Sequence, residues 1–275
     1  MNKIISKLKT GKIIIGMIHV QALPGTPLHK LSLPEIIEIA VKEAEIYQKS
    51  GIDAIMLENM HDIPYLNNQA GPEIVAALTA IAAKIKDKIA LPCGIQILAG
   101  ANKAALAVAK ACGLEFIRVE NFAYAHVADE GFMESCAGEL LRYRKLINAE
   151  DTAIFTDVKK KHSSHAITSD ISIQEAVKTH EFFLSDGIII TGSSTGEKPS
   201  LTDLQQTKAA TGLPVIAGSG ITAENISSYW KHADGFIIGS YFKHQGFWKN
   251  ELSPERIKAL LKLVSKLKTN KTDLI

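Results

Sequence analysis

The sequence contains little cysteine and shows no sign of an exported or membrane-spanning protein. Its 275 residues include three cysteines, Cys93, Cys112 and Cys136, and no two of them have Cys-x-x-Cys spacing. This pattern argues against a disulfide framework or a zinc ribbon and indicates a reducing compartment. The N-terminus lacks the features of a signal or transit peptide, and no apolar run reaches the ~18 residues of a membrane span. We therefore expect a soluble, cytoplasmic protein without a transmembrane segment.

The chain also lacks an excess of either charge. Lys and Arg number 31 and Asp and Glu number 29, which gives a net charge of +2. Nucleic-acid binding depends on excess positive charge, so we expect no nucleic-acid partner. The basic residues of the stretch 258–271 are typical of the solvated face of a last helix. Hydrophobic residues make up 46% of the chain, which is ample for a large core.

Two kinds of cofactor motif are absent. No Gly-x-Gly-x-x-Gly follows the first predicted strand, which argues against a dinucleotide-binding fold, and neither His-x-His nor His-Glu-x-x-His occurs. Side chains that suit Zn, Mn or Fe do follow the predicted strands, namely His19, His61, His126, His162, His165, Glu58, Glu120 and Asp157. Sequence spacing does not bring them within bonding distance. We assign no metal-site residue and no certain cofactor, and a divalent metal stays an open hypothesis.

What the sequence does contain is a regular alternation of short apolar runs and helical patterns. Strands are predicted over residues 13–18, 53–57, 89–97, 115–119, 153–158, 187–190, 214–217 and 235–238. Helices are predicted from a capping-box pattern at 32–35 to Gly51, and over 72–86, 102–112, 133–147, 173–184, 200–210, 223–230 and 254–268. Near-wholly apolar strands in such alternation imply a parallel sheet covered on both faces, and eight units favour a closed barrel. We predict a single (β/α)8 TIM barrel over residues 1–275.

Glycine-rich turns follow the last two predicted strands. One is Gly218-Ser-Gly220 with Thr222 placed to cap a helix, and the other is Gly239-Ser240. Glycine exposes backbone N–H groups to an anion, a helix N-terminus adds partial positive charge, and barrels often bind phosphate after strands seven and eight. The alternative is that tight turns need glycine for backbone reasons alone. The predicted phosphate-binding residues are Gly192, Gly218, Ser219, Gly220, Gly239 and Ser240.

Ionisable residues stand at the ends of the predicted strands, where barrel active sites form. Glu58 and Glu120 are candidates for general acid and base if their surroundings separate their pKa values. The alternative interpretation is that Arg118 or a lysine satisfies their buried charge. His19 and Arg118 are candidates for positioning the substrate or stabilising charge.

The fifth predicted strand ends in Asp157 and a run of three lysines, residues 159–161. Asp157 and Lys159 share strand parity, so we expect both to point into the barrel mouth. Alternation makes Lys159 and Lys161 the better candidates for an anion ligand, a base or a Schiff-base nucleophile, and Lys160 the exposed residue. Alternatively, the whole run is a solvated loop face.

The chain resembles the BtpA family, which is named after a photosystem I biogenesis factor. The matching segments lie in order at residues 16–19, 23–27, 51–53, 57–59, 62–64, 116–119, 129–131, 141–144, 157–162, 191–196, 218–222, 239–240, 243 and 246. The resemblance implies a barrel related to the ribulose-phosphate-binding group and implies little about the reaction. Many members carry Leu-Arg-Asn-Asp where this chain has Leu98-Ala-Gly-Ala-Asn102, and Val-Asn where it has Val119-Glu120. These departures indicate a subgroup with altered substrate contacts.

Together, these observations predict an enzyme that moves a proton on a small phosphorylated molecule, as an isomerase, epimerase or lyase does. The predicted catalytic residues are Glu58, Asp157, Lys159, His19, Arg118 and Glu120. One alternative is a non-catalytic assembly or regulatory factor with a vestigial phosphate pocket, and another is a metal-dependent hydrolase. Barrels of this class often pair, so a homo-oligomer is left open.

Overall fold

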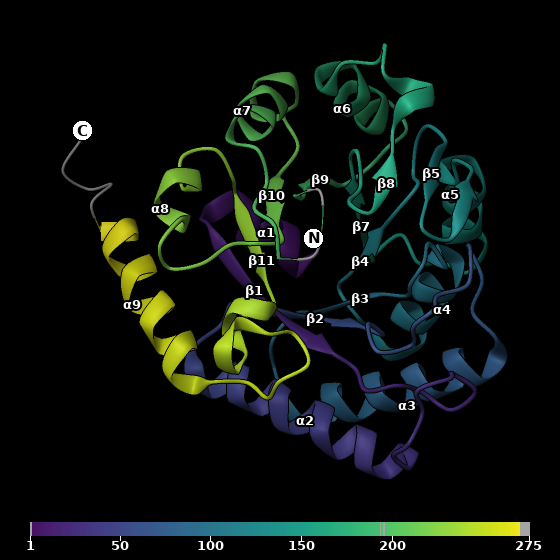
Figure 1. The fold of residues 1–275 in the computed structure, drawn as a ribbon, viewed down its shortest axis with the longest axis vertical. Coiled ribbons are helices and arrows are strands. Elements are labelled where there is room, and N and C mark those ends of the chain that lie inside the picture. The colour runs from purple at the N-terminus through teal and green to yellow at the C-terminus, as the bar shows by residue number, and fades with distance from the viewer. Residues whose placement is uncertain (1, 193, 195, 270–275) are drawn as a thin grey trace.

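The computed structural model, which describes residues 2–192, 194 and 196–269, contains a closed barrel of eight parallel strands. The strands follow one another around the barrel in chain order (Figure 1). They are β1 Ile13–His19, β2 Ala54–Glu58, β3 Cys93–Gln96, β4 Phe116–Val119, β7 Ala153–Asp157, β9 Gly187–Ile190, β10 Val215–Gly218 and β11 Gly235–Ile238. The predicted (β/α)8 architecture is confirmed.

Helices follow the barrel strands and cover their outer face (Figure 1). They are α2 Leu33–Ser50, α3 Pro72–Lys88, α4 Asn102–Cys112, α5 Ala137–Leu146, α6 Ile173–Phe182, α7 Leu201–Ala210, α8 Ile226–Tyr229 and α9 Pro254–Thr269, with 3-10 turns η1 Ala166–Thr168, η2 Ser240–Phe242 and η3 His244–Gly246. The predicted start of α2 is confirmed, because the Glu35 carboxylate accepts a 2.7 Å hydrogen bond from the Ser32 N–H. Its predicted end is confirmed as well, with Gly51 in the left-handed conformation at φ 83°.

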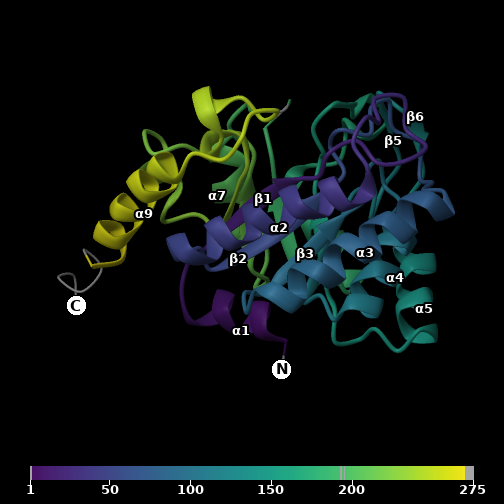
Figure 2. The ribbon, with the colours of Figure 1, turned by 90° about the horizontal axis from the view of Figure 1, so that it is seen from below.

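An N-terminal helix that the sequence patterns did not predict, α1 Lys3–Thr10, closes the end of the barrel where the strands begin. Ile4 and Leu8 are buried among the inward side chains of the strands. The Asn2 side chain caps the helix by accepting from the N–H of Ile4 at 2.9 Å. Figure 2 shows α1 below the barrel, and the opposite end is therefore the open one.

A small antiparallel sheet at that opposite end was also not predicted. It consists of β5 His126–Ala128, β6 Gly131–Met133 and β8 Ser163–Ser164. Figure 2 shows β5 and β6, and Figure 1 shows β8. The predicted start of the fourth helix at residue 133 is wrong, because Met133 belongs to β6 and α5 begins at Ala137. The third strand is also shorter than predicted and starts at Cys93, after Pro92, which has no N–H for a sheet ladder.

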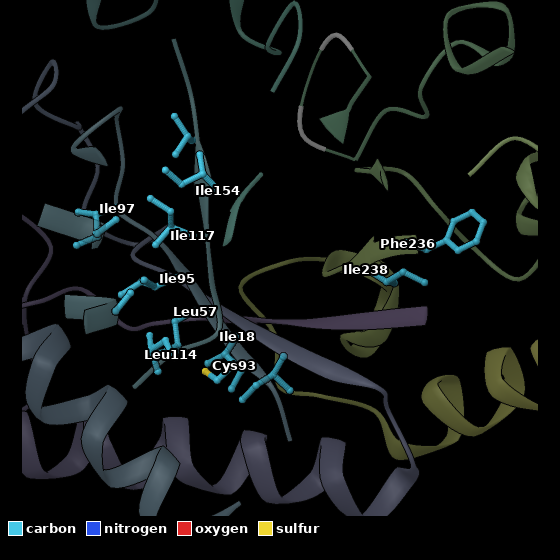
Figure 3. Close-up of a cluster of buried hydrophobic side chains, with 14 of the residues drawn as sticks. Ile18, Leu57, Cys93, Ile95, Ile97, Leu114, Ile117, Ile154, Phe236 and Ile238 are labelled. Carbon is cyan, nitrogen blue, oxygen red and sulfur yellow. The ribbon is translucent and has the colours of Figure 1, made fainter. Parts of the chain in front are cut away.

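Alternation along the strands divides the core into two layers. A large outer layer fills the space between strands and helices, and Figure 3 draws some of its side chains, including Leu57, Ile95 and Ile238. A smaller layer fills the barrel interior and includes Met17, Phe116 and the α1 residues. The interior is therefore packed with apolar side chains up to the level where the strands end.

Candidate functional site

The inward-pointing positions of four strands end in polar side chains at the open end of the barrel. Every second residue points inward, and this series ends in His19 on β1, Glu58 on β2, Arg118 on β4 and Asp157 on β7. The strand register pairs His19 with Glu58, and Glu58 with Gln96 on β3. These side chains therefore form a polar layer directly above the apolar interior.

A pocket opens above this layer and joins most of the predicted site residues. It is lined by the predicted residues His19, Glu58, Arg118, Ser219, Gly220, Gly239 and Ser240. Lys161, a candidate from the lysine run, also lines it, and so do Met60, Tyr241 and Arg256, which were not predicted. The cavity volume is about 150 Å³, several times the roughly 30 Å³ that one water molecule takes up in the liquid. A pocket of this size suits a small molecule.

Glycine occurs at these turns for different structural reasons. Gly220 has φ +57°, and a methyl group there would lie 2.4 Å from the Lys198 nitrogen, so both conformation and close packing require glycine. A methyl group on Gly192 would lie 2.2 Å from the Glu197 carbonyl oxygen. Gly218 would accept a methyl group at ordinary contact distances. Gly220 is therefore required by its conformation and close packing, and Gly192 by close packing, while phosphate binding at these turns stays a prediction. Both Gly192 and Gly218 lie outside the pocket lining.

The prediction that Thr222 caps a helix directly after the first glycine turn is wrong. Helix α8 has four residues and begins at Ile226, with Asn225 rather than Thr222 at the N-cap position. The Thr222 N–H instead donates to Asn225 Oδ1 at 2.9 Å. A helix this short adds little dipole, so any anion in the pocket depends on turn N–H groups and side-chain cations.

His19 and Glu58 form a buried acid–base pair on the pocket wall. His19 Nε2 lies 3.8 Å from Glu58 Oε2, and the two residues are 7% and 4% exposed. Burial, aided by the charges of Lys243 and Lys161, lowers the pKa of His19 well below its usual value and keeps the imidazole neutral. Burial also raises the pKa of Glu58, against the opposing effects of Lys161 and Arg118. Burial therefore moves the two pKa values in opposite directions, and at 3.8 Å the two groups lie close together beyond hydrogen-bond distance.

Arg118 and Asp157 form a bidentate ion pair beneath the pocket. Arg118 Nε donates to both Asp157 oxygens at 3.1 Å, and Nη2 donates to Oδ2 at 2.8 Å. Burial opposes the charge of Arg118, but the Asp157 carboxylate more than offsets it and raises the pKa of the guanidinium. Arg118 reaches the pocket, whereas Asp157 lies behind it. A catalytic role for Asp157 stays a prediction, and its observed contact is structural.

The expected alternation along residues 159–161 is wrong for Lys159 and Lys160, whereas Lys161 does line the main pocket. Strand β7 ends at Asp157, and Lys159 adopts φ +49°, which ends the strand parity on which the prediction depended. Lys159 is consequently exposed and lies outside the main pocket. Lys160, expected to be exposed, is 6% exposed, and Lys161 is partly buried and lines the pocket.

Glu120 belongs to a separate buried network. Its carboxylate accepts from Lys160 Nζ at 3.1 Å and from Gln96 Nε2 at 3.1 Å. Glu130 Oε2 lies 3.7 Å from the same Lys160 ammonium. The alternative interpretation of Glu120, that a lysine satisfies its charge, is confirmed, whereas Arg118 pairs with Asp157 instead. Glu120 lies outside the main pocket.

Two pocket residues, Arg256 and Tyr241, carried no signal in the sequence. Arg256 lies in the first turn of α9, and its guanidinium carbon is 4.4 Å from the centre of the Tyr241 ring. The basic pattern of that helix indicated only a solvated face. Stacking on Tyr241 turns Arg256 towards the pocket, and no local pattern encodes this contact.

The structure also bears on the metal ligands, the membrane-spanning helices and the cysteines considered from the sequence. Within residues 2–192, 194 and 196–269, no three His, Cys, Asp or Glu side chains come together as metal ligands would. Over the same residues, no helix has the length and apolar character needed to cross a membrane. All three cysteines are free, as their spacing predicted.

A closed eight-stranded parallel barrel with a charged pocket at the carboxyl ends of its strands places this chain among the (β/α)8-barrel proteins. The chain belongs to the BtpA family, whose model matches residues 10–266. An uncharacterized protein of Caenorhabditis elegans, named as mitochondrial, is 48% identical over 96% of this chain and 98% of its own. The photosystem I biogenesis protein BtpA of Synechocystis is 34% identical over 94% of this chain and 89% of its own.

A solved structure with a similar fold is (S)-3-O-geranylgeranylglyceryl phosphate synthase from Thermoplasma acidophilum, in complex with its substrate sn-glycerol-1-phosphate. The TM-score is 0.61 with 14% identity, over 95% of this chain and 96% of the other. At this identity the likeness establishes the fold alone.

Proposed function

We propose that this protein is an enzyme that transfers a proton on a small phosphorylated metabolite, as an isomerase, epimerase or lyase does. The observation that carries the proposal is that one pocket is lined both by the buried pair His19 and Glu58 and by the glycine turns after β10 and β11. An acid–base pair and an anion site in one small pocket are the parts such a reaction needs.

The phosphate end would be held at the turns. Ser219, Gly220, Gly239 and Ser240 line that side of the pocket, and Arg256 adds a cation there. The Thermoplasma synthase, a barrel of similar fold, has sn-glycerol-1-phosphate as its substrate, which supports a phosphorylated ligand for this chain. Because α8 is short, we expect Arg256 to contribute more to phosphate affinity than the helix does.

The reacting end would lie against Glu58 and His19. Glu58 is the base: its raised pKa brings it closer to that of a weak carbon acid, which assists proton abstraction. The neutral His19 imidazole is suited to donate a hydrogen bond to an oxygen of the substrate. Arg118, fixed by Asp157, would stabilise the negative charge that develops.

Thermal unfolding against a panel of phosphorylated metabolites, each with and without divalent cations, tests the phosphate part. A ligand present at about 100 times its dissociation constant adds about 2.7 kcal/mol to the free energy of unfolding. We expect one sugar phosphate to stabilise the wild type, and Ser219→Gln, which fills the pocket, to lose the effect. Ser227→Gln, at an exposed position on α8, is the matched control. Equal stabilisation of both variants would count against this site.

A non-catalytic role has one supporting observation, which is that the Synechocystis relative is named a photosystem I biogenesis protein. On this reading the pocket is vestigial and the protein assists assembly or regulation. A cell that depends on this protein separates the two: if Glu58→Gln and Asp157→Asn both keep the cellular role, catalysis is not what the cell requires. Stabilisation by no member of the metabolite panel would favour the same reading.

A further inference from the structure

Lys160 and Lys161 are adjacent in the sequence but have opposite surroundings. Lys160 Nζ lies 3.1 Å from Glu120 and 3.7 Å from Glu130, and these carboxylates raise its pKa although burial opposes the charge. Lys160 is therefore held as an ammonium ion. Lys161 points to the other side, into the main pocket.

Lys161 lies near a cation as well as near carboxylates, whereas Lys160 lies between two carboxylates. Burial lowers the pKa of Lys161, and the nearby Arg118 guanidinium lowers it further, against the opposing effects of Glu58 and Asp157. Asp157 is already bound to Arg118 through both oxygens, which weakens the effect by which its carboxylate raises the pKa of Lys161. Burial and a second cation are the two conditions under which a lysine amine becomes a nucleophile.

A nucleophilic amine also requires a nearby group that can donate and accept a proton, and the pocket contains one. Lys161, Glu58 and His19 line one pocket together with the glycine turns. Glu58 is 4% exposed and lies 3.8 Å from His19. A carboxyl group that lines the same pocket as the amine can supply a proton for loss of water and then remove one from carbon.

We propose that Lys161 is the nucleophile of this pocket and forms an imine with the carbonyl group of a small phosphorylated aldehyde or ketone. The inference rests on the proposed function and narrows its substrate class. The amine attacks the carbonyl carbon, a C–N bond forms, and the carbonyl oxygen leaves as water with both amine hydrogens or their equivalents. A proton from the Glu58 carboxyl leaves the product as a protonated iminium.

The iminium then makes the next step easier. The Glu58 carboxylate takes a proton from the carbon next to the iminium carbon, and the electron pair of that C–H bond moves to form a neutral enamine. Return of the proton to either face of the same carbon regenerates the iminium. Addition of water to the iminium carbon then releases the product, with inverted configuration where the opposite face was protonated, and restores Lys161 and Glu58. No oxidant, reductant or second substrate is needed.

Reductive trapping tests the inference on the full chain. Dihydroxyacetone phosphate and glyceraldehyde 3-phosphate serve as the ketone and aldehyde probes, with sodium cyanoborohydride as reductant. We expect an adduct with the mass of the probe less one oxygen atom, mapped to Lys161 by peptide mass spectrometry. Trapping of unphosphorylated dihydroxyacetone at the same concentration should be at least tenfold slower.

Two variants make the outcome specific. Lys161→Met should give no adduct yet still be stabilised by inorganic phosphate against thermal unfolding, which shows that it is folded. Lys159→Arg, at the exposed neighbouring position, should be trapped like the wild type. An adduct on another lysine, or equal trapping of Lys161→Met, overturns the inference.

The phosphate measurement separates this failure from failure of the proposed function. Stabilisation of the wild type by inorganic phosphate, without any adduct from either probe, overturns the imine and leaves the phosphate pocket standing. An adduct on Lys161 without stabilisation by phosphate supports the imine and overturns the proposal of a phosphate site. Absence of both overturns both.

Discussion

Gly239 lies directly against the imidazole of His19. A methyl group on Gly239 would lie 2.9 Å from His19 Cε1 and 3.0 Å from Nε2, closer than carbon atoms pack. The φ of Gly239 is −115°, outside the positive-φ region that favours glycine, and the observed constraint at this position is the lack of space next to His19. The second glycine turn therefore packs directly against His19 of the proposed acid–base pair.

The first prediction follows from this contact. Gly239→Ala should push His19 away from Glu58, cost about 1–3 kcal/mol of stability through overpacking and abolish stabilisation by a phosphorylated ligand. Gly218→Ala is the matched control, because its methyl group would meet Thr191 Cγ2 at 3.4 Å, an ordinary contact. Thermal unfolding with and without the ligand measures both effects. Similar behaviour of the two variants would contradict a special role for the Gly239 contact.

The second prediction concerns Glu58 as the base. Glu58→Gln should slow exchange of a substrate C–H with deuterium from solvent by about 10²- to 10⁴-fold while phosphate binding persists. The ionised carboxylate is the active form, and burial raises its pKa. The rate should therefore rise with pH through a value above that of an exposed glutamate. NMR of the substrate in D₂O measures it, and an undiminished rate in Glu58→Gln would exclude Glu58 as the base.

The third prediction separates Asp157 from Lys159, two residues predicted to act together. Asp157→Asn leaves Arg118 buried beside a neutral partner and should lower the free energy of unfolding by about 3 kcal/mol. Lys159→Gln, at an exposed position, should change it by less than about 0.5 kcal/mol and leave the reaction rate nearly unchanged. Urea unfolding and substrate turnover test both. A large loss of rate in Lys159→Gln would restore the original assignment.

The fourth prediction is a loss of stability in acid. His180 is 2% exposed, its Nδ1 lies 2.8 Å from Thr156 Oγ1, and burial lowers its pKa from 6.5 to about 4. Between these values the unfolded chain binds a proton that the folded chain does not. Stability should therefore be intact above pH 6.5 and fall by about 3 kcal/mol as the pH drops to 4.

Buried His126, whose pKa burial also lowers to about 4, contributes to the same slope, so a variant isolates the part that His180 supplies. His180→Asn can keep a hydrogen bond to Thr156 and removes the titrating group. Urea unfolding at several pH values should give a shallower pH dependence in this variant than in the wild type. An unchanged slope would show that His180 is not the group responsible.

Local patterns in the sequence were sufficient for the architecture. Apolar runs of strand length and helical spacing between them predicted the eight barrel units, because burial on both faces of a parallel sheet demands apolar residues throughout. Patterns failed where segments are short or are stabilised from a distance. α1 depends on burial of Ile4 and Leu8 in the barrel, and β5, β6 and β8 have two or three residues each.

For the candidate site, the sequence by itself determined which residues stand at strand ends, among them His19, Glu58 and Arg118, since alternation continues as long as the strand does. Only the tertiary structure decided their partners. Arg118 pairs with Asp157, 39 positions away, and Arg256 enters from the last helix. The lysine run was misread because β7 ends at Asp157 and the positive φ of Lys159 breaks the alternation. Parity is a property of extended backbone, and once the chain leaves that conformation only contacts with distant residues fix where a side chain points.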